Sequence, residues 1–265
     1  MSHDTGQRAS PVTIAQSELH RLDSQVVGQR YQVRVRLPED YSDGNDVYPV
    51  LYLLDGDHMF AMATDIVQYL VYGGNVPDLI IVSPAYGSKR TPDVGGTNMR
   101  NRDLLPFPVE GVPDQSAGAR DYLAFLEREL MPFVASRYRV DGTQRLLAGY
   151  SLGALFVVYA LFEKPGLFDV YLAWDSFAEQ LWAHEDAFAR SGVAPSVRVC
   201  LASRADPDAD LAPLAERLAG RGLPGLSVSH TRLAGGEEDH FLVPGEALTR
   251  CLIAAFHPSG AADAP

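Results

Sequence analysis

The sequence has few of the features that mark secreted, membrane-spanning or disulfide-linked proteins. It contains only two cysteines, Cys200 and Cys251, and each lies in an apolar stretch typical of a buried strand or helix. Lone cysteines in such settings are more typical of packed thiols than of a disulfide. The first ten residues are polar and lack the apolar core of a secretory signal. These absences predict a cytoplasmic protein.

Basic residues are also scarce. The 265 residues include 22 Lys and Arg against 34 Asp and Glu, which gives a formal net charge of −12. A surface of this sign repels phosphate backbones and offers no basic patch to anionic membranes. No apolar run approaches the roughly 20 residues that span a bilayer. We therefore expect neither nucleic acid nor a membrane as a partner.

Strand and helix patterns alternate along most of the chain. Residues 13–22 and 25–37 alternate apolar and polar side chains, which predicts an antiparallel hairpin at a sheet edge. From Tyr48 onward, short apolar runs typical of strands buried on both faces alternate with helical patterns. The predicted strands span residues 48–54, 79–83, the run from 145, 169–174, 197–202 and 226–233. The predicted helices span about 56–72, 116–137, 152–162, a segment between 174 and 197, 209–218 and 245–256. This order predicts an α/β protein with a mostly parallel, doubly wound sheet.

The domain organisation is expected to be simple. No internal repeat, linker or second core is visible, so we predict one domain over residues 1–265, with a core at about 12–256. The ends, 1–10 and 258–265, are expected to be disordered. Residues 85–114 are rich in Gly, Pro, Asn and Arg and lack periodicity, which indicates a long functional or mobile loop.

The segment Arg145–Ala154 carries the strongest functional signal. Its motif Gly149-Tyr-Ser-Leu-Gly153 follows an apolar strand pattern and precedes an apolar helix, which is the context of a G-x-S-x-G nucleophile elbow. The two glycines allow a strained turn that exposes the serine hydroxyl. A serine is a good nucleophile only when a base lies beside it. We therefore predict that Ser151 is a catalytic nucleophile and seek its base.

His240 has the position expected of that base. In enzymes with this elbow, an acid and then a histidine follow the serine along the chain. His240 lies in a polar, glycine-rich loop after the last predicted strand, from which a side chain reaches the carboxyl edge of the sheet. The other histidines lie in the N-terminal region or within predicted helices and strands.

A carboxylate is needed to orient the imidazole. Asp206, Asp208 and Asp210 all follow the predicted strand 197–202. We predict that Asp206, which is nearest the end of that strand, is the acid, and that Asp208 is the next candidate. The three aspartates lack the glycine and the closing glutamate of an EF-hand, so no metal is expected there.

Two backbone amides are expected to form the oxyanion hole. The N–H of Leu152, the residue after the serine, is one donor. The other should come from the turn after an earlier strand, where the N–H of Asp57 fits. His58 beside that turn and Tyr150 in the elbow are expected to contact substrate, with an ordinary position in the first turn of a helix as the alternative for His58.

Arginines in the segment 85–114 are a further candidate for substrate contact. Arg90, Arg100 and Arg102 would attract an anionic substrate to an otherwise acidic protein. The alternative is that they pair with acids of the same segment, namely Asp93, Asp103 and Glu110. If Arg100 attracts anions, Arg100→Ala should raise KM more for anionic esters than for neutral ones.

These motifs together make the chain resemble the putative esterase (esterase D-like) family of α/β-hydrolases. The resemblance spans residues 12–256 and rests on Tyr48-Pro-Val-Leu-Tyr-Leu-Leu-Asp-Gly56, Arg100-Asn-Arg-Asp-Leu-Leu-Pro106, Gly149-Tyr-Ser-Leu-Gly153 and the loop of His240. That family includes siderophore (enterobactin-type) esterases, S-formylglutathione hydrolases, feruloyl and acetyl-xylan esterases, and mycolyltransferases. The resemblance implies an α/β-hydrolase fold, with helices on both faces of the sheet.

The resemblance also implies a chemistry. It supports Ser151 as nucleophile, His240 as base, and the Asp57 and Leu152 amides as oxyanion hole. Many members have histidine and glycine where this chain has Tyr150 and Ala154. Some siderophore esterases of the family resemble Ser–His dyads, so the need for an acid is left open.

The predicted activity is hydrolysis of a small-molecule carboxylic ester through an acyl-enzyme, with a siderophore or another natural product as the ester. No metal or organic cofactor is needed. An acyltransferase would use the same serine and histidine with an alcohol in place of water. A non-catalytic binding module on a hydrolase scaffold is the third interpretation. The sequence does not indicate an oligomeric state.

Overall fold

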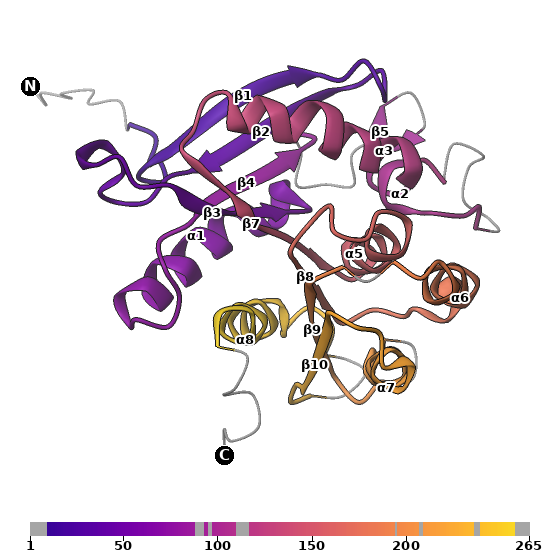
Figure 1. Ribbon diagram of the computed structural model, residues 1–265. Helices are drawn as coiled ribbons and strands as arrows, with labels where there is room; N and C mark the ends of the chain where they lie inside the picture. The colour runs from indigo at the N-terminus through magenta and orange to yellow at the C-terminus, as the bar shows by residue number, and fades with distance from the viewer. Residues whose placement is uncertain are drawn as a thin grey trace, which may run out of the picture.

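A twisted, mostly parallel sheet forms the centre of the molecule (Figure 1). Its eight strands lie in the order β1-β2-β4-β3-β7-β8-β9-β10. They are β1 (Ser17–Asp23), β2 (Arg30–Arg36), β3 (Tyr48–Leu53), β4 (Ile80–Ala85), β7 (Val140–Tyr150), β8 (Val170–Trp174), β9 (Val197–Ser203) and β10 (Leu226–Arg232). β2 pairs antiparallel with β1 and β4, and the other neighbours pair in parallel. The predicted hairpin at the sheet edge is therefore confirmed.

The computed structural model describes residues 10–87, 93–94, 97–109, 117–193, 195–206, 209–235 and 239–257. Apart from Ser10, the ends that the sequence predicts to be disordered lie outside these ranges. Within them, no helix combines the length and the apolar character needed to cross a membrane.

Helices cover both faces of the sheet, as the resemblance implies. One face packs against α1 (Gly56–Tyr72) and α8 (Pro244–Phe256). The other face packs against α3 (Ala119–Phe125), the π-helical segment η2 (Leu126–Leu130), α4 (Met131–Ala135), α5 (Leu152–Glu163), α6 (Trp182–Arg190) and α7 (Ala212–Arg221). Two short 3-10 turns, η1 (Tyr41–Asp43) and η3 (Glu179–Leu181), lie between these elements. The α/β-hydrolase architecture expected from the sequence is confirmed (Figure 1).

Burial explains why the strand patterns are visible in the sequence. All six residues of β3 are buried, with Val50 and Tyr52 in one core and Leu51 and Leu53 in the other. A strand covered on both faces has no polar positions, so it reads as one apolar run. The edge strand β1 instead has only half-buried and exposed side chains.

Two segments differ from the prediction. The segment 85–114 contains the short strands β5 (Asp93–Val94) and β6 (Thr97–Asn98) and the helix α2 (Met99–Leu104). A helix of six residues is too short to show the apolar periodicity of a longer helix in its sequence. Tertiary hydrogen bonds stabilise α2 instead, because the buried carboxylate of Asp103 accepts from the hydroxyls of Tyr31 and Tyr86. The single helix predicted over 116–137 is divided into α3, η2 and α4, and the wider π-helical turn ends near Pro132, which has no amide hydrogen.

Candidate active site

Three side chains converge at the carboxyl ends of neighbouring parallel strands. Ser151 follows β7, Asp175 follows β8, and His240 lies in the segment between β10 and α8. Nε2 of His240 is 3.2 Å from Oγ of Ser151, and Nδ1 is 2.6 Å from Oδ2 of Asp175. Because a carboxylate only accepts, Nδ1 of the imidazole donates to Asp175, and Nε2 of the neutral ring accepts from Ser151. This is the geometry of a serine–histidine–aspartate triad.

The turn at Ser151 has the backbone of a nucleophile elbow. Ser151 has φ 55° and ψ −121°, outside the common regions for a non-glycine residue, and its N–H donates to the carbonyl of Trp174 at 3.0 Å. A Cβ on Gly149 would lie 2.4 Å from the carbonyl carbon and oxygen of Gly153. The glycine before the serine is therefore required by the close approach of two backbone segments.

This contact leads to a stability prediction. Gly149→Ala is expected to destabilise the fold by about 2–4 kcal/mol, because a backbone contact at this distance is relieved only by moving the elbow. Gly142→Ala is the matched control, since a Cβ there meets nothing within 4 Å in the same strand. Urea unfolding of both variants measures the effect, and equal stabilities would contradict the prediction.

The structure corrects the histidine partner from Asp206 to Asp175. Oδ2 of Asp206 accepts from Nη2 of Arg204 at 2.9 Å, while Asp175 occupies the position beside Nδ1 of His240. Asp210 accepts from Ser203 Oγ at 2.8 Å. Asp208, the second candidate, lies outside the described residues.

Strand order is the physical reason for this difference. β8 lies directly beside β7, so a residue at its carboxyl end is next to Ser151, whereas β9 is one strand farther away. Asp175 also follows its strand immediately, with φ 55°, and its N–H donates to Ala202 at 2.9 Å. The available sequence signal was an aspartate at the end of the buried run 169–174, and sequence reasoning did not use it.

Tyr150 supports the histidine segment. Its hydroxyl donates to the backbone carbonyl of His240 at 2.7 Å, and the two rings lie 4.8 Å apart. Burial raises the pKa of the Tyr150 hydroxyl above its ordinary value, so the group remains a donor throughout the neutral range. The residue between Gly149 and Ser151 thus connects the elbow to the segment that carries His240.

Both predicted oxyanion donors lie at the start of a helix. Leu152 is the first residue of α5 and Asp57 is the second residue of α1, where backbone N–H groups have no acceptor within the helix. The carboxylate of Asp57 is buried and accepts from Nη2 of Arg34 at 2.9 Å and from the N–H of Tyr86 at 2.7 Å. These bonds fix the turn at the start of α1.

A cavity of about 480 Å³ opens beside the serine. Its wall includes His58, Arg100 and Tyr150, the three residues predicted to contact substrate. The other lining residues are Asp55, Met59, Met62, Ser151, His240, Phe241 and Pro244. The wall therefore combines the reactive groups with apolar surface from α1 and from the segment before α8.

Arg100 is paired with an acid. Its Nε and Nη2 donate to the two oxygens of Asp55 at 2.7 and 2.9 Å, and Nη2 also lies 3.4 Å from the carbonyl oxygen of Tyr150. Nε of Arg102 likewise donates to Asp103 at 2.6 Å. Arg90, Glu110 and the side chain of Asp93 lie outside the described part of the chain. Arg102 thus follows the pairing alternative, whereas Arg100 pairs with an acid outside its own segment.

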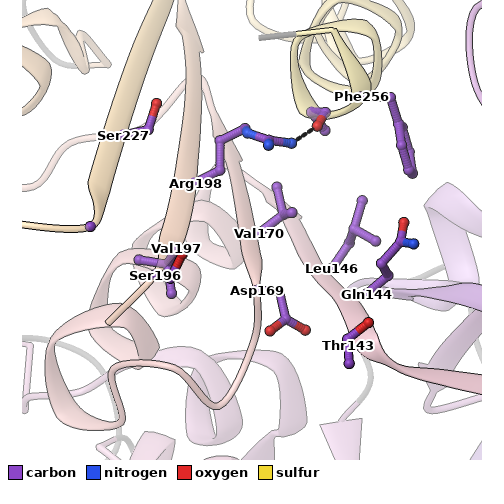
Figure 2. Close-up of a pocket in the computed structure, with 12 residues that line it drawn as sticks. Thr143, Gln144, Leu146, Asp169, Val170, Ser196, Val197, Arg198, Ser227 and Phe256 are labelled. Atoms are coloured by element: carbon purple, nitrogen blue, oxygen red, sulfur yellow. Dashed lines mark hydrogen bonds between the residues drawn. The ribbon is translucent and has the colours of Figure 1, made fainter. Parts of the chain in front are cut away.

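A second cavity, of about 490 Å³, lies at the opposite edge of the sheet (Figure 2). It is formed at the amino ends of β7 to β10, and Arg198 extends across it to the carbonyl of Ala255 at the end of α8 (Figure 2). No histidine or cysteine occurs among its described lining residues, so it lacks a nucleophile–base pair. The cavity beside Ser151 is the candidate active site.

Known proteins are similar to this chain in sequence. The model of the family described as "Putative esterase" matches residues 24–201. A siderophore triacetylfusarinine C esterase of Aspergillus fumigatus is 32% identical over 178 residues, which cover 63% of this chain and 58% of that protein. The ferri-bacillibactin esterase BesA of Bacillus subtilis is 25% identical over 280 residues, which cover 96% of this chain and 94% of that protein. The chain thus spans less than two thirds of the fungal relative it matches and nearly all of the bacterial one.

Solved structures share the fold. An IroE-like serine hydrolase from Shewanella oneidensis superposes with a TM-score of 0.77 at 24% identity, over 91% of this chain and 80% of that one. The siderophore hydrolase EstB from Aspergillus nidulans superposes with a TM-score of 0.75 at 23% identity, over 96% of this chain and 99% of that one.

Proposed function

Since the chain belongs to the putative esterase family, we propose that it is a serine hydrolase that cleaves a carboxylic ester of a small molecule through an acyl-enzyme. The observation that carries this proposal is the hydrogen-bonded series from Ser151 through His240 to Asp175, at 3.2 and 2.6 Å. The series opens into a cavity large enough for a small molecule.

The proposed reaction has two halves. His240 Nε2 takes the proton of Ser151 as Oγ attacks the ester carbonyl, and the imidazolium then protonates the departing alcohol. A water that gives its proton to His240 then attacks the acyl-enzyme. The bond between the acyl carbon and Oγ breaks, the acid leaves, and the imidazolium returns the proton to Oγ of Ser151. Asp175 holds the ring with Nδ1 protonated and stabilises the imidazolium that forms in each half.

The oxyanion of each tetrahedral intermediate is assigned to the backbone N–H groups of Leu152 and Asp57. Both amides belong to first turns of helices, where the positive end of the helix dipole adds to the hydrogen bonds. The turn before α1 lies against the start of α5, because a Cβ on Gly153 would be 3.0 Å from Oδ2 of Asp55.

A siderophore or another natural-product ester is the proposed substrate. The support comes from the relatives, two of which are named as a siderophore triacetylfusarinine C esterase and a ferri-bacillibactin esterase. The apolar wall formed by Met59, Met62 and Phe241 suits the hydrocarbon and ring surfaces of such molecules.

Intact-mass spectrometry after exposure to a fluorophosphonate tests the proposal. We expect one covalent adduct on the wild-type protein and none on Ser151→Ala. An unlabelled wild type would favour the binding-module interpretation. Unmodified wild-type protein is then assayed on a panel of esters with and without alcohol acceptors, because transfer to an alcohol in preference to water would identify an acyltransferase.

The pairing of Arg100 changes the prediction made from sequence. Because Asp55 neutralises Arg100, we expect Arg100→Ala to lower kcat/KM by about tenfold for neutral and anionic esters alike, through loss of the link between the Asp55 turn and the elbow. Steady-state kinetics on a matched pair of esters, one neutral and one carboxylated, measures this. A selective loss on the anionic ester would instead show that Arg100 attracts charge.

A further inference from the structure

We infer that Arg204 and Asp206 are positioning residues that act through Asp175 to set the basicity of His240. The inference rests on the proposed function, because it assumes that His240 is the base. The side chains of Arg204 and Asp175 are both fully buried. Nε of Arg204 lies 3.0 and 3.1 Å from the two carboxylate oxygens of Asp175, and Nη2 lies 2.9 Å from Oδ2 of Asp206.

The four groups form a row of alternating charge, which we call the charge row: His240, Asp175, Arg204 and Asp206. Asp175 stabilises a protonated His240 at 2.6 Å, and the positive charge of Arg204 behind it offsets part of that stabilisation. Asp206, which is also largely buried, adds the second negative charge. The row therefore has a net charge of −1 when the imidazole is neutral and becomes balanced when the imidazole takes the proton of Ser151.

Charge balance has a large effect here because the row is buried. A buried ion without a partner is strongly disfavoured, and charges separated by protein interact more strongly than charges in water. The arrangement thus favours the protonated histidine, which is the form that the proposed reaction generates. A second role follows for Arg204: its Nε contacts both oxygens of Asp175 and fixes the carboxylate plane that His240 meets.

Other titratable groups lie around the row, and most are already compensated. Arg100 is paired with Asp55 across the cavity, and Arg232, which donates to the carbonyl of Arg204, is paired with Asp210 at 3.0 Å. Tyr150 donates to the carbonyl of His240, and His58, Asp55 and Arg100 line the same cavity as His240. Asp206 is distinguished from them by its direct bond to the cation that holds Asp175.

Removing the charge of Asp206 and removing the charge of Arg204 should shift the pKa of His240 in opposite directions. Asp206→Asn leaves a neutral Asp175–Arg204 pair, so the imidazolium loses stabilisation and the pKa of His240 falls. Arg204→Met leaves two carboxylates and no cation, so the pKa rises. We expect each shift to be roughly one pH unit, the size expected of a unit charge on the order of 10 Å away at an effective dielectric constant of about 20. The double variant Arg204→Met/Asp206→Asn restores the net charge of −1 and should return the pKa toward the wild-type value.

The acid limb of the pH profile of kcat/KM reports this pKa in the free enzyme. It is measured with p-nitrophenyl butyrate for the wild type, both single variants, the double variant and Asp210→Asn. The last is the matched control, because it removes the same charge from the same segment but outside the charge row. We expect its shift to be smaller than that of Asp206→Asn. Shifts in the same direction for Arg204→Met and Asp206→Asn, or an unmoved limb in Asp206→Asn, would overturn the inference.

A second measurement separates this inference from the proposed function. NMR titration of ¹⁵N-histidine-labelled protein, assigned with His240→Gln, gives the pKa of His240 whether or not esters are hydrolysed. Opposite shifts in a protein that hydrolyses no ester would support the charge row and refute the esterase proposal. If the pKa of His240 is the same in the variants as in the wild type, and the protein hydrolyses esters through Ser151, the esterase proposal would be supported and the charge row refuted. If Arg204→Met does not fold, the comparison of Asp206→Asn with Asp210→Asn decides the question.

Discussion

Replacing Ser151 by alanine is expected to lower kcat for ester hydrolysis by about 10⁶-fold, the size of loss found when a triad serine is removed. The substitution removes Oγ, the atom that forms the acyl-enzyme, and leaves His240 with no hydroxyl to deprotonate at 3.2 Å. The oxyanion amides and the cavity remain, so a small residual rate above the uncatalysed one is also expected. Steady-state kinetics on a reactive ester, after removal of any contaminating esterase, measures the loss.

Ser203 provides the matched control for this experiment. Its Oγ is 2.8 Å from Nε2 of His230 and 2.8 Å from Oδ1 of Asp210, so it resembles a second triad by its neighbours. It is nevertheless fully buried, and its Oγ also accepts from the N–H of Leu211 at 3.0 Å. Ser203→Ala should therefore lower stability but keep kcat within about tenfold of the wild type. A loss in Ser203→Ala as large as that in Ser151→Ala would refute the assignment of the nucleophile.

The parts of this protein that could be predicted from sequence are those encoded by local patterns. The central strands are apolar because both of their faces are covered, and the elbow is visible because its glycines, serine and flanking elements are contiguous. Gly149 could be assigned a role for the same reason, since its contact with Gly153 lies within one turn. His240 could be selected because few histidines follow the last strand.

The acid could not be predicted because its choice depends on strand order. An aspartate follows both β8 and β9, and the local sequence does not say which strand lies next to β7. Asp175 lies near Ser151 because β8 is adjacent to β7, whereas Asp206 pairs with Arg204, two residues before it in the chain. Sequence reasoning expected the carboxylate beside His240 to follow the strand 197–202, whereas the structure has it directly after β8.

The partners of Arg100 and Tyr150 could not be predicted from the local sequence either. Arg100 is 45 residues from Asp55 in the chain, and the hydroxyl of Tyr150 meets a carbonyl 90 residues away. Only the folded sheet brings these groups together. The charge of an arginine in the segment 85–114 is therefore poor evidence about substrate until its partner is known.

Asp175→Asn is expected to lower kcat by about 10³–10⁴-fold, whereas Asp206→Asn should lower it by less than about tenfold. A neutral amide at residue 175 no longer stabilises the imidazolium, and its NH₂ group can donate to the ring and favour the tautomer with the proton on Nε2. In that tautomer, His240 cannot accept the proton of Ser151. The contact of 2.6 Å between Nδ1 and Asp175 makes this aspartate the sensitive position.

The comparison of these two variants also decides between a triad and a dyad. In a Ser–His dyad, the histidine keeps its function without a carboxylate, so Asp175→Asn would retain at least a tenth of the wild-type kcat. Fluorophosphonate labelling rates provide a second measure, since they report activation of Ser151 without product release. If Asp175→Asn is labelled slowly and Asp206→Asn is labelled rapidly, Asp175, which follows β8, is the acid. The reverse order would contradict the assignment of Asp175 and would favour Asp206 as the partner of His240.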